Sequence, residues 1–130
     1  MSGFILHLPM PPSLNHANAV GRNKRTGKPQ VYPSKEKIAF FKEAGDMYMM
    51  QRPPSLKAVP GPFTYHLILN EEMRHGNSDG DNRQKYVLDF VQRVGLIEND
   101  KLALGGSWSW GPCEHGAMLS VRPANPVHEK

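Results

Sequence analysis

The chain has 130 residues, a length typical of one globular domain built around one hydrophobic core. Sixteen Lys and Arg against twelve Asp and Glu give a formal net charge of +4, which permits a polyanionic partner without requiring one. A single cysteine, Cys113, excludes an internal disulfide framework and favours a reducing cytoplasm. No apolar run approaches the roughly 20 residues that span a bilayer, and the first residues lack a basic leader, so we expect neither a membrane segment nor a signal peptide. We expect one domain over residues 1–130, frayed after about residue 123.

The first half of the chain predicts a strand followed by a helix. Residues 3–9 place Phe4, Leu6 and Leu8 on one face of a strand. Residues 13–33 are polar and basic and predict a surface loop or a loose hairpin. A helix is expected over about 35–50, with four residues near helical spacing: Ile38, Phe41, Ala44 and Tyr48.

The second half predicts a strand, a second helix and two further strands. Residues 62–70 alternate as a half-buried strand does. A helix is expected over about 82–94, with a stripe of Val87, Phe90, Val91 and Val94, and Gly95 is suited to end it. A third strand would carry Leu102 to Trp110, with Gly105-Gly106 as a bulge or break, and a fourth would carry Ala117, Leu119 and Val121. The order β-α-β-α-β-β predicts an α/β (α+β) fold with a small mixed four-stranded sheet and two main helices.

The chemistry gathers around the second helix. Asp79 and Asp81 stand two apart, so in an extended approach to the helix their carboxylates would point the same way. Two such carboxylates repel unless a cation lies between them or one of them keeps its proton, and their hard oxygens suit Mg²⁺ or Mn²⁺. Lys85 lies one turn into the helix, and Asp100 follows the helix. This pattern predicts a divalent-metal site with a cationic neighbour, which is an arrangement suited to cutting phosphodiesters.

Structural explanations for the same residues stay open. Asp81 could cap the helix with Gln84 as its partner three residues on, and it could also ligate a metal. Asp79 could be an ordinary loop aspartate and Asp100 a turn residue. Lys85 could pair with the acids one turn away on either side. The six histidines show no clear pairing in the sequence, so the sequence predicts no zinc site.

The acidic motif has a specific resemblance. The run Asp79-Gly80-Asp81-Asn82-Arg83-Gln84-Lys85, followed by Asp89 and Asp100, resembles the RusA family of Holliday junction resolvases. The run Pro11-Pro12-Ser13-Leu14-Asn15 resembles the family's proline-rich opening. The resemblance extends over nearly the whole chain, from about residue 4 to 122.

The resemblance implies a homodimeric, metal-dependent endonuclease that resolves four-way DNA junctions by paired symmetric nicks in recombination and repair. Such proteins are often encoded by phages or prophages, which implies the cytoplasm of a bacterium or a phage-infected bacterium. The resemblance implies that Asp79, Asp81 and Asp100 bind Mg²⁺ or Mn²⁺ and that Lys85 assists catalysis. Two alternatives of another class are a junction-binding module that has lost cleavage and a D-x-D metal site for a nucleotide sugar.

Nucleic-acid contacts are expected from basic residues and from the proline-rich opening. The candidates are Arg22, Lys24, Arg25 and Arg74, together with Asn15. A solvated basic loop would show the same residues. The pair Trp108 and Trp110 could belong to the core, to a dimer face or to a base-stacking surface, and core or interface is favoured.

Overall fold

The computed structural model describes residues 3–12, 18–22, 29–33, 35–51, 56–74 and 80–124. Its strands and helices, in chain order, are β1 (Phe4–Leu8), β2 (Asn18–Arg22), β3 (Pro29–Pro33), α1 (Lys35–Gln51), β4 (Phe63–Asn70), α2 (Gly80–Arg93), β5 (Ala103–Gly111) and β6 (Ala117–Pro123). Two short 3-10 helices, η2 (Glu71–Met73) and η3 (Asp100–Leu102), flank α2. The tail expected to fray lies mostly outside the described residues.

Four strands form one mixed sheet in the order β1-β6-β4-β5. The strand β6 pairs antiparallel with both β1 and β4, whereas β4 and β5 are parallel. The parallel pair needs a crossover connection, and α2 supplies it. The mixed four-stranded sheet, the two main helices and their order along the chain confirm the predicted fold class.

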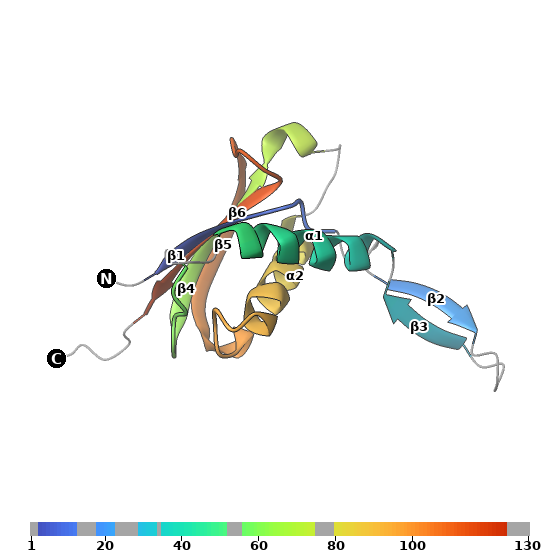
Figure 1. Ribbon diagram of the computed structural model, residues 1–130, viewed down its shortest axis with the longest axis horizontal. Helices are drawn as coiled ribbons and strands as arrows, with labels where there is room; N and C mark the ends of the chain where they lie inside the picture. Colours follow the sequence, from blue (N-terminus) through green and yellow to red (C-terminus); the bar gives the residue numbers. More distant parts are fainter. Residues whose placement is uncertain are drawn as a thin grey trace.

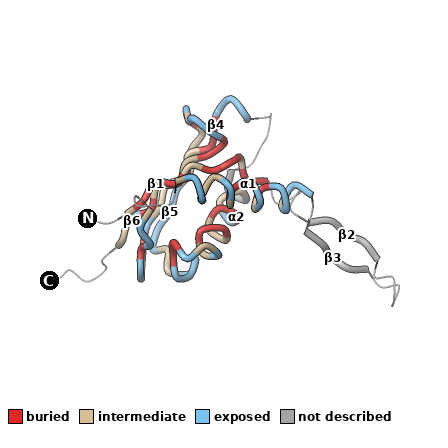
Figure 2. The backbone as a smooth tube through the Cα atoms, in the orientation of Figure 1, coloured by how far each residue is buried: buried red, intermediate tan, exposed pale blue. Residues whose placement is uncertain are grey.

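Both helices cover the same face of the sheet, and the core lies between the sheet and the two helices (Figure 1, Figure 2). Alternate strand residues point into this core, among them Leu6, Leu67 and Leu119, which are fully buried. The stripe predicted for α2 is confirmed, because Val87, Phe90 and Val91 are buried. Within the described part of the chain, no helix is long and apolar enough to cross a bilayer.

One prediction for α1 was wrong in detail. The helix buries Phe40 and Ala44, while Ile38 is 57% exposed. Phe40 reaches the core because it stacks edge-on against Phe90 of α2, with ring centroids 6.4 Å apart. The docking of α2 therefore selects which face of α1 is buried, and apolar spacing within α1 did not reveal that choice.

The predicted stop at Gly95 is confirmed. Gly95, two residues after the last residue of α2, has φ +82, a conformation that favours glycine. The amide of Leu96 donates to the carbonyl of Val91 at 2.9 Å, and the amide of Gly95 donates to Gln92 at 3.1 Å. These are the two bonds of a Schellman motif, which satisfies the last carbonyls of the helix.

The third strand contains a bulge, but at Leu104, one residue before the predicted glycine pair, and the strand continues through both glycines. The register of β4 against β5 shifts between Phe63 and Thr64, which leaves Leu104 without an opposite residue. Gly106 is required two residues further on, because a Cβ there would lie 2.0 Å from the ring of Tyr65. The hydroxyl of that ring in turn donates to Gln84 of α2 at 2.7 Å, so this glycine lets β4 hold the first half of α2.

Residues 18–33 resolve the choice between a loop and a hairpin. Strands β2 and β3 pair antiparallel, with Val20 opposite Val31. The hairpin stands apart from the sheet, beyond the N-terminal end of α1 (Figure 1). Because β1 leads into it and α1 follows it, the hairpin extends from the side of the molecule where α1 begins.

Candidate metal and nucleic-acid site

The acidic motif opens α2 at the carboxyl end of the parallel strands. The helix begins at Gly80, so Asp81 is its second residue and does not precede it as a cap. Because α2 connects parallel strands, its first turn lies over the end where β4 and β5 finish. This is the edge at which open α/β sheets bind ligands. Asp79 and the side chain of Asp81 lie outside the described part of the chain.

Lys85 is exposed on the second turn of α2. One expected partner, Asp89, is engaged elsewhere, with its carboxylate 3.4 Å from Arg93. Lys85 forms no ion pair with any residue whose side chain the structure describes. Its ammonium group is therefore accessible to an anion that approaches the start of α2.

The start of α2 contacts the proline-rich segment that follows β1. Nη1 of Arg83 donates a hydrogen bond to the carbonyl of Pro11, across 72 positions of sequence. The two stretches that carry the family resemblance therefore meet in space, although residues 13–17, with Asn15, lie outside the described part.

A pocket of about 320 Å³ opens beside this contact. Glu36 and Glu43 lie two turns apart on one face of α1, and both line the pocket together with Arg83. Sequence reasoning did not place these two glutamates near the motif, because helical spacing alone does not say what a helix face contacts. Its lining residues are Met10, Pro11, Pro12, Glu36, Ala39, Phe40, Glu43 and Arg83.

Asp100 lies at the opposite end of α2. It is the exposed first residue of η3, and its amide donates to the side-chain oxygen of Gln92 at 2.9 Å. Asn99 caps the same turn by accepting from the amide of Lys101 at 2.9 Å. Asp100 is therefore fixed beside the last turns of α2, where β5 begins.

The length of α2 separates the two acidic positions. Asp81 precedes Gln92 by eleven residues of one helix, which corresponds to about 16 Å along the axis at 1.5 Å per residue. An aspartate carboxylate reaches only a few ångströms from its own backbone. Within one protomer, the backbones of Asp81 and Asp100 therefore lie at opposite ends of α2.

Of the basic candidates, Arg74 is the one whose side chain the structure describes. It follows η2 at the end of β4, on the side where α2 begins, and lies 5.7 Å from the centroid of Trp110. Arg22 ends β2, but its side chain is outside the description, as are residues Lys24 and Arg25. Trp108 and Trp110 contact each other edge-on and pack partly buried against the core, so both belong to the rim of the core.

Cysteine chemistry is not favoured at Cys113. Burial, and then the Glu71 carboxylate, raise the pKa of its thiol. Its sulfur donates to the carbonyl of Ile68 at 3.8 Å. A protonated thiol directed at the sheet is a poor nucleophile.

A cluster of possible metal ligands that the sequence did not predict lies at the carboxyl end of β4 and β5, the end of the sheet at which α2 begins. Side chains of His7, Glu114 and His115 bring one ligand atom each to within 4.8 Å of the others. His7 is more than a hundred positions from Glu114 and His115 in sequence, and the pairing of β1 with β6 brings it to them. No local spacing could have revealed this group.

No protein-family model matches the chain, and neither does any curated protein. The features of this chain that bear on its function are the acidic motif with Lys85, the contact of Arg83 with the proline-rich segment, and the position of Asp100 at the far end of α2.

Proposed function

We propose that this protein is a metal-dependent endonuclease that resolves four-way DNA junctions by paired nicks, acting as a homodimer in the cytoplasm of a bacterium or phage-infected bacterium. The observation that carries the proposal is the motif D-x-D-N-x-x-K at the start of a crossover helix, with its lysine exposed. The bond from Arg83 to Pro11 adds support, because it joins the motif to the other stretch that resembles RusA resolvases.

The donor set fits a hard cation. Carboxylates at positions 79, 81 and 100 offer only oxygen ligands, which suit Mg²⁺ or Mn²⁺. Such an ion, when bound, polarises the scissile phosphate and lowers the pKa of a water. Lys85 then offsets the charge that develops on the phosphoryl oxygens, a role that its exposed ammonium group suits.

The separation of the acids supports a site that two protomers share. Asp79 and Asp81 of one protomer would be completed by Asp100 of the partner subunit, because about 16 Å of helix axis separates Asp81 from Gln92, the residue that Asp100 of the same chain contacts. A two-fold dimer then contains two equivalent sites. A four-way junction also has two-fold symmetry, so two such sites match the two strands that must be cut.

Basic residues around the motif would contact the DNA backbone. Arg74 follows η2 at the end of β4, and Arg22, Lys24 and Arg25 belong to the sequence of the β2–β3 hairpin. A projecting hairpin can follow a DNA arm away from the cleavage point. Each phosphate contact releases counterions, so binding should weaken steeply with salt.

The first test is a nicking assay on a synthetic four-way junction. The wild-type protein should cut it symmetrically in Mg²⁺ and leave it intact in EDTA. Asp79→Asn should reduce cutting by about 100-fold or more, because the amide cannot supply the charge that holds the ion, while junction binding in a gel-shift assay persists. Binding without cutting by the wild type would indicate a junction-binding module. A fully active Asp79→Asn protein would remove the metal assignment.

Lys85→Ala tests the role of the lysine. Turnover at saturating junction should fall by about 10²–10³-fold, with a smaller effect on the dissociation constant, because the charge acts on the developing transition state. Lys42→Ala, which removes an exposed lysine from α1, is the matched control and should leave turnover unchanged. A loss of affinity alone would make Lys85 a phosphate contact instead.

A further inference from the structure

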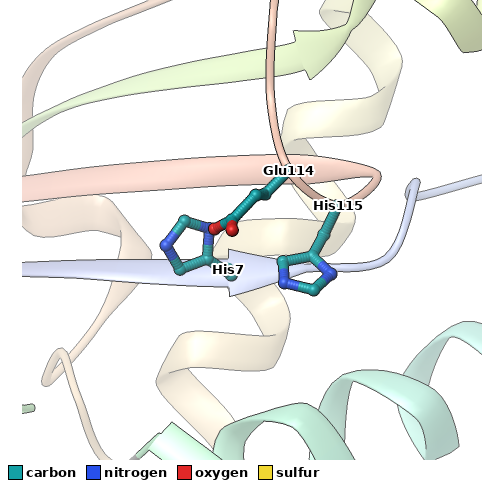
Figure 3. A group of neighbouring side chains, drawn as sticks. All are labelled: His7, Glu114 and His115. Atoms are coloured by element: carbon teal, nitrogen blue, oxygen red, sulfur yellow. The ribbon is translucent and has the colours of Figure 1, made fainter.

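We propose that His7, Glu114 and His115 form a binding site for one zinc-class transition-metal ion, separate from the acidic site at α2. Their ligand atoms all lie within 4.8 Å of one another. His7 comes from β1, and the other two come from the connection between β5 and β6 (Figure 3). The site would join an edge strand to the loop beside it.

The backbone of His7 is fixed by a side chain of α1. The amide of His7 donates to Oε1 of Gln51 at 2.8 Å, and Nε2 of Gln51 donates to the carbonyl of His7 at 2.8 Å. Nε2 of Gln51 also donates to the carbonyl of Met47 in its own helix at 2.9 Å. These bonds occupy the outward backbone groups of His7 on the edge strand and leave its imidazole for another partner.

The loop that carries Glu114 and His115 is fixed from below. Asn70 is 9% exposed, and its side-chain amide donates to the carbonyl of His115 at 2.9 Å. Its backbone amide donates to the carbonyl of Gly116 at 2.9 Å. Gly116 lies against the segment after β1, because a Cβ there would come within 2.0 Å of the amide of Met10. The backbones of both ligand-bearing segments are thus held relative to each other before any ion binds.

One ring nitrogen within the cluster is buried without a partner in the described part of the chain. Nδ1 of His7 has no hydrogen-bond partner among these residues, and Figure 3 shows the His7 ring directed toward the carboxylate of Glu114. Buried polar atoms are nearly always satisfied, so such an atom calls for an explanation. A metal ion shared with Glu114 would satisfy it. The ring of His115 stands edge-on to that of His7, with centroids 5.4 Å apart.

The ligand types choose the metal. Two imidazoles and one carboxylate suit Zn²⁺ and its neighbours in the first transition series, whereas Mg²⁺ prefers an all-oxygen set. Zinc binds nitrogen at about 2.0–2.1 Å, so side-chain rotations that draw the three ligand atoms together would complete the contact. Three protein ligands leave a fourth position for water. Cys113 is not one of the ligands, because its thiol donates a hydrogen bond to the carbonyl of Ile68.

The proposed site is on the other side of the sheet from the helices. Phe4, Leu6 and Leu8 point into the core, so His7 between them faces the helix-free side. His66 lies on this same side, where it contacts Ser107 at 2.6 Å and Ser109 at 3.1 Å, outside the cluster. It provides a matched control that removes a histidine without touching the site.

Zinc binding to the full chain, prepared without a histidine tag and stripped of metal, tests the proposal. The wild type should bind one Zn²⁺ per chain by calorimetry, and Co²⁺ in its place should give the strong visible bands of a four-coordinate ion. His115→Ala and Glu114→Gln should weaken binding by about 100-fold or more, since even loss of a group that only orients a ligand costs roughly 10–100-fold. His66→Ala should bind like the wild type.

The outcomes separate this site from the acidic one. Asp79→Asn should leave zinc affinity unchanged, and excess Mg²⁺ should not displace the Co²⁺ bands. Glu114 and His115 are exposed loop residues, so their variants should fold, and circular dichroism checks this. Equal zinc affinity in the wild type, His115→Ala and Glu114→Gln would overturn the proposal, as would the absence of a one-to-one complex. Neither result would affect the nuclease assay.

Discussion

Mixing Asp81→Asn protein with Asp100→Asn protein should restore DNA nicking that neither variant has alone. In a mixed dimer, the site that contains Asp81 of the second variant and Asp100 of the first keeps all its carboxylates. The other site has lost both. This follows if each site takes its acids from two protomers, which the separation of about 16 Å along α2 supports.

A plasmid with an extruded cruciform distinguishes one cut from two. The wild-type dimer should make paired nicks and linearise the plasmid, whereas the mixed dimer, with one intact site, should yield open circles only. Co-expression with two different tags would isolate the mixed dimer. If the mixture stays inactive while the wild type cuts, each site lies within one protomer and the shared site is wrong, although the nuclease itself would stand.

Phe90→Ala should lower the free energy of unfolding by about 3–5 kcal/mol, the range for removing a buried aromatic ring. Phe90 is 3% exposed, and its ring lies 6.3–6.4 Å from those of Phe40, Phe41 and Tyr48. Phe90 packs α2 against α1, so replacing its ring by a methyl group leaves a cavity between the two helices. Chemical denaturation monitored by circular dichroism measures the loss.

Ile38→Ala is the control for this substitution. Ile38 is also apolar and lies on α1, but it is 57% exposed. Surface substitutions usually change stability by less than about 0.5 kcal/mol, so this variant should unfold like the wild type. Equal losses in both variants would mean that the aromatic cluster does not join the helices.

The sequence predicted most of the fold because its signals were local. The alternation in β4, the Val87 to Val91 stripe and the glycine after α2 each lie within one element, and each is confirmed. The buried face of α1 was not predictable in this way. Ile38 fits the helical spacing as well as Phe40 does, and only the position of Phe90 on another helix decides between them.

The candidate sites divide along the same line. The acidic motif is contiguous and was recognisable, yet its spacing to Asp100 in the chain gave no hint that a whole helix separates them in space. His7 and His115 could not be linked at all, because strand pairing joins them. The position of Glu36 and Glu43 in the pocket beside Arg83 was not predictable either, because it depends on how two helices pack and not on local spacing.

The position of β6 within the sheet affects how the chain can assemble. β1 and β4 do not touch each other in the sheet; both pair with β6, which is the last strand of the described chain. Until β6 has been synthesised, β1 has no neighbour in the sheet and β4 can pair only with β5. The sheet can therefore form completely only when β6, the last strand in sequence, inserts between β1 and β4. Pairing between strands so distant in sequence is intrinsically slow.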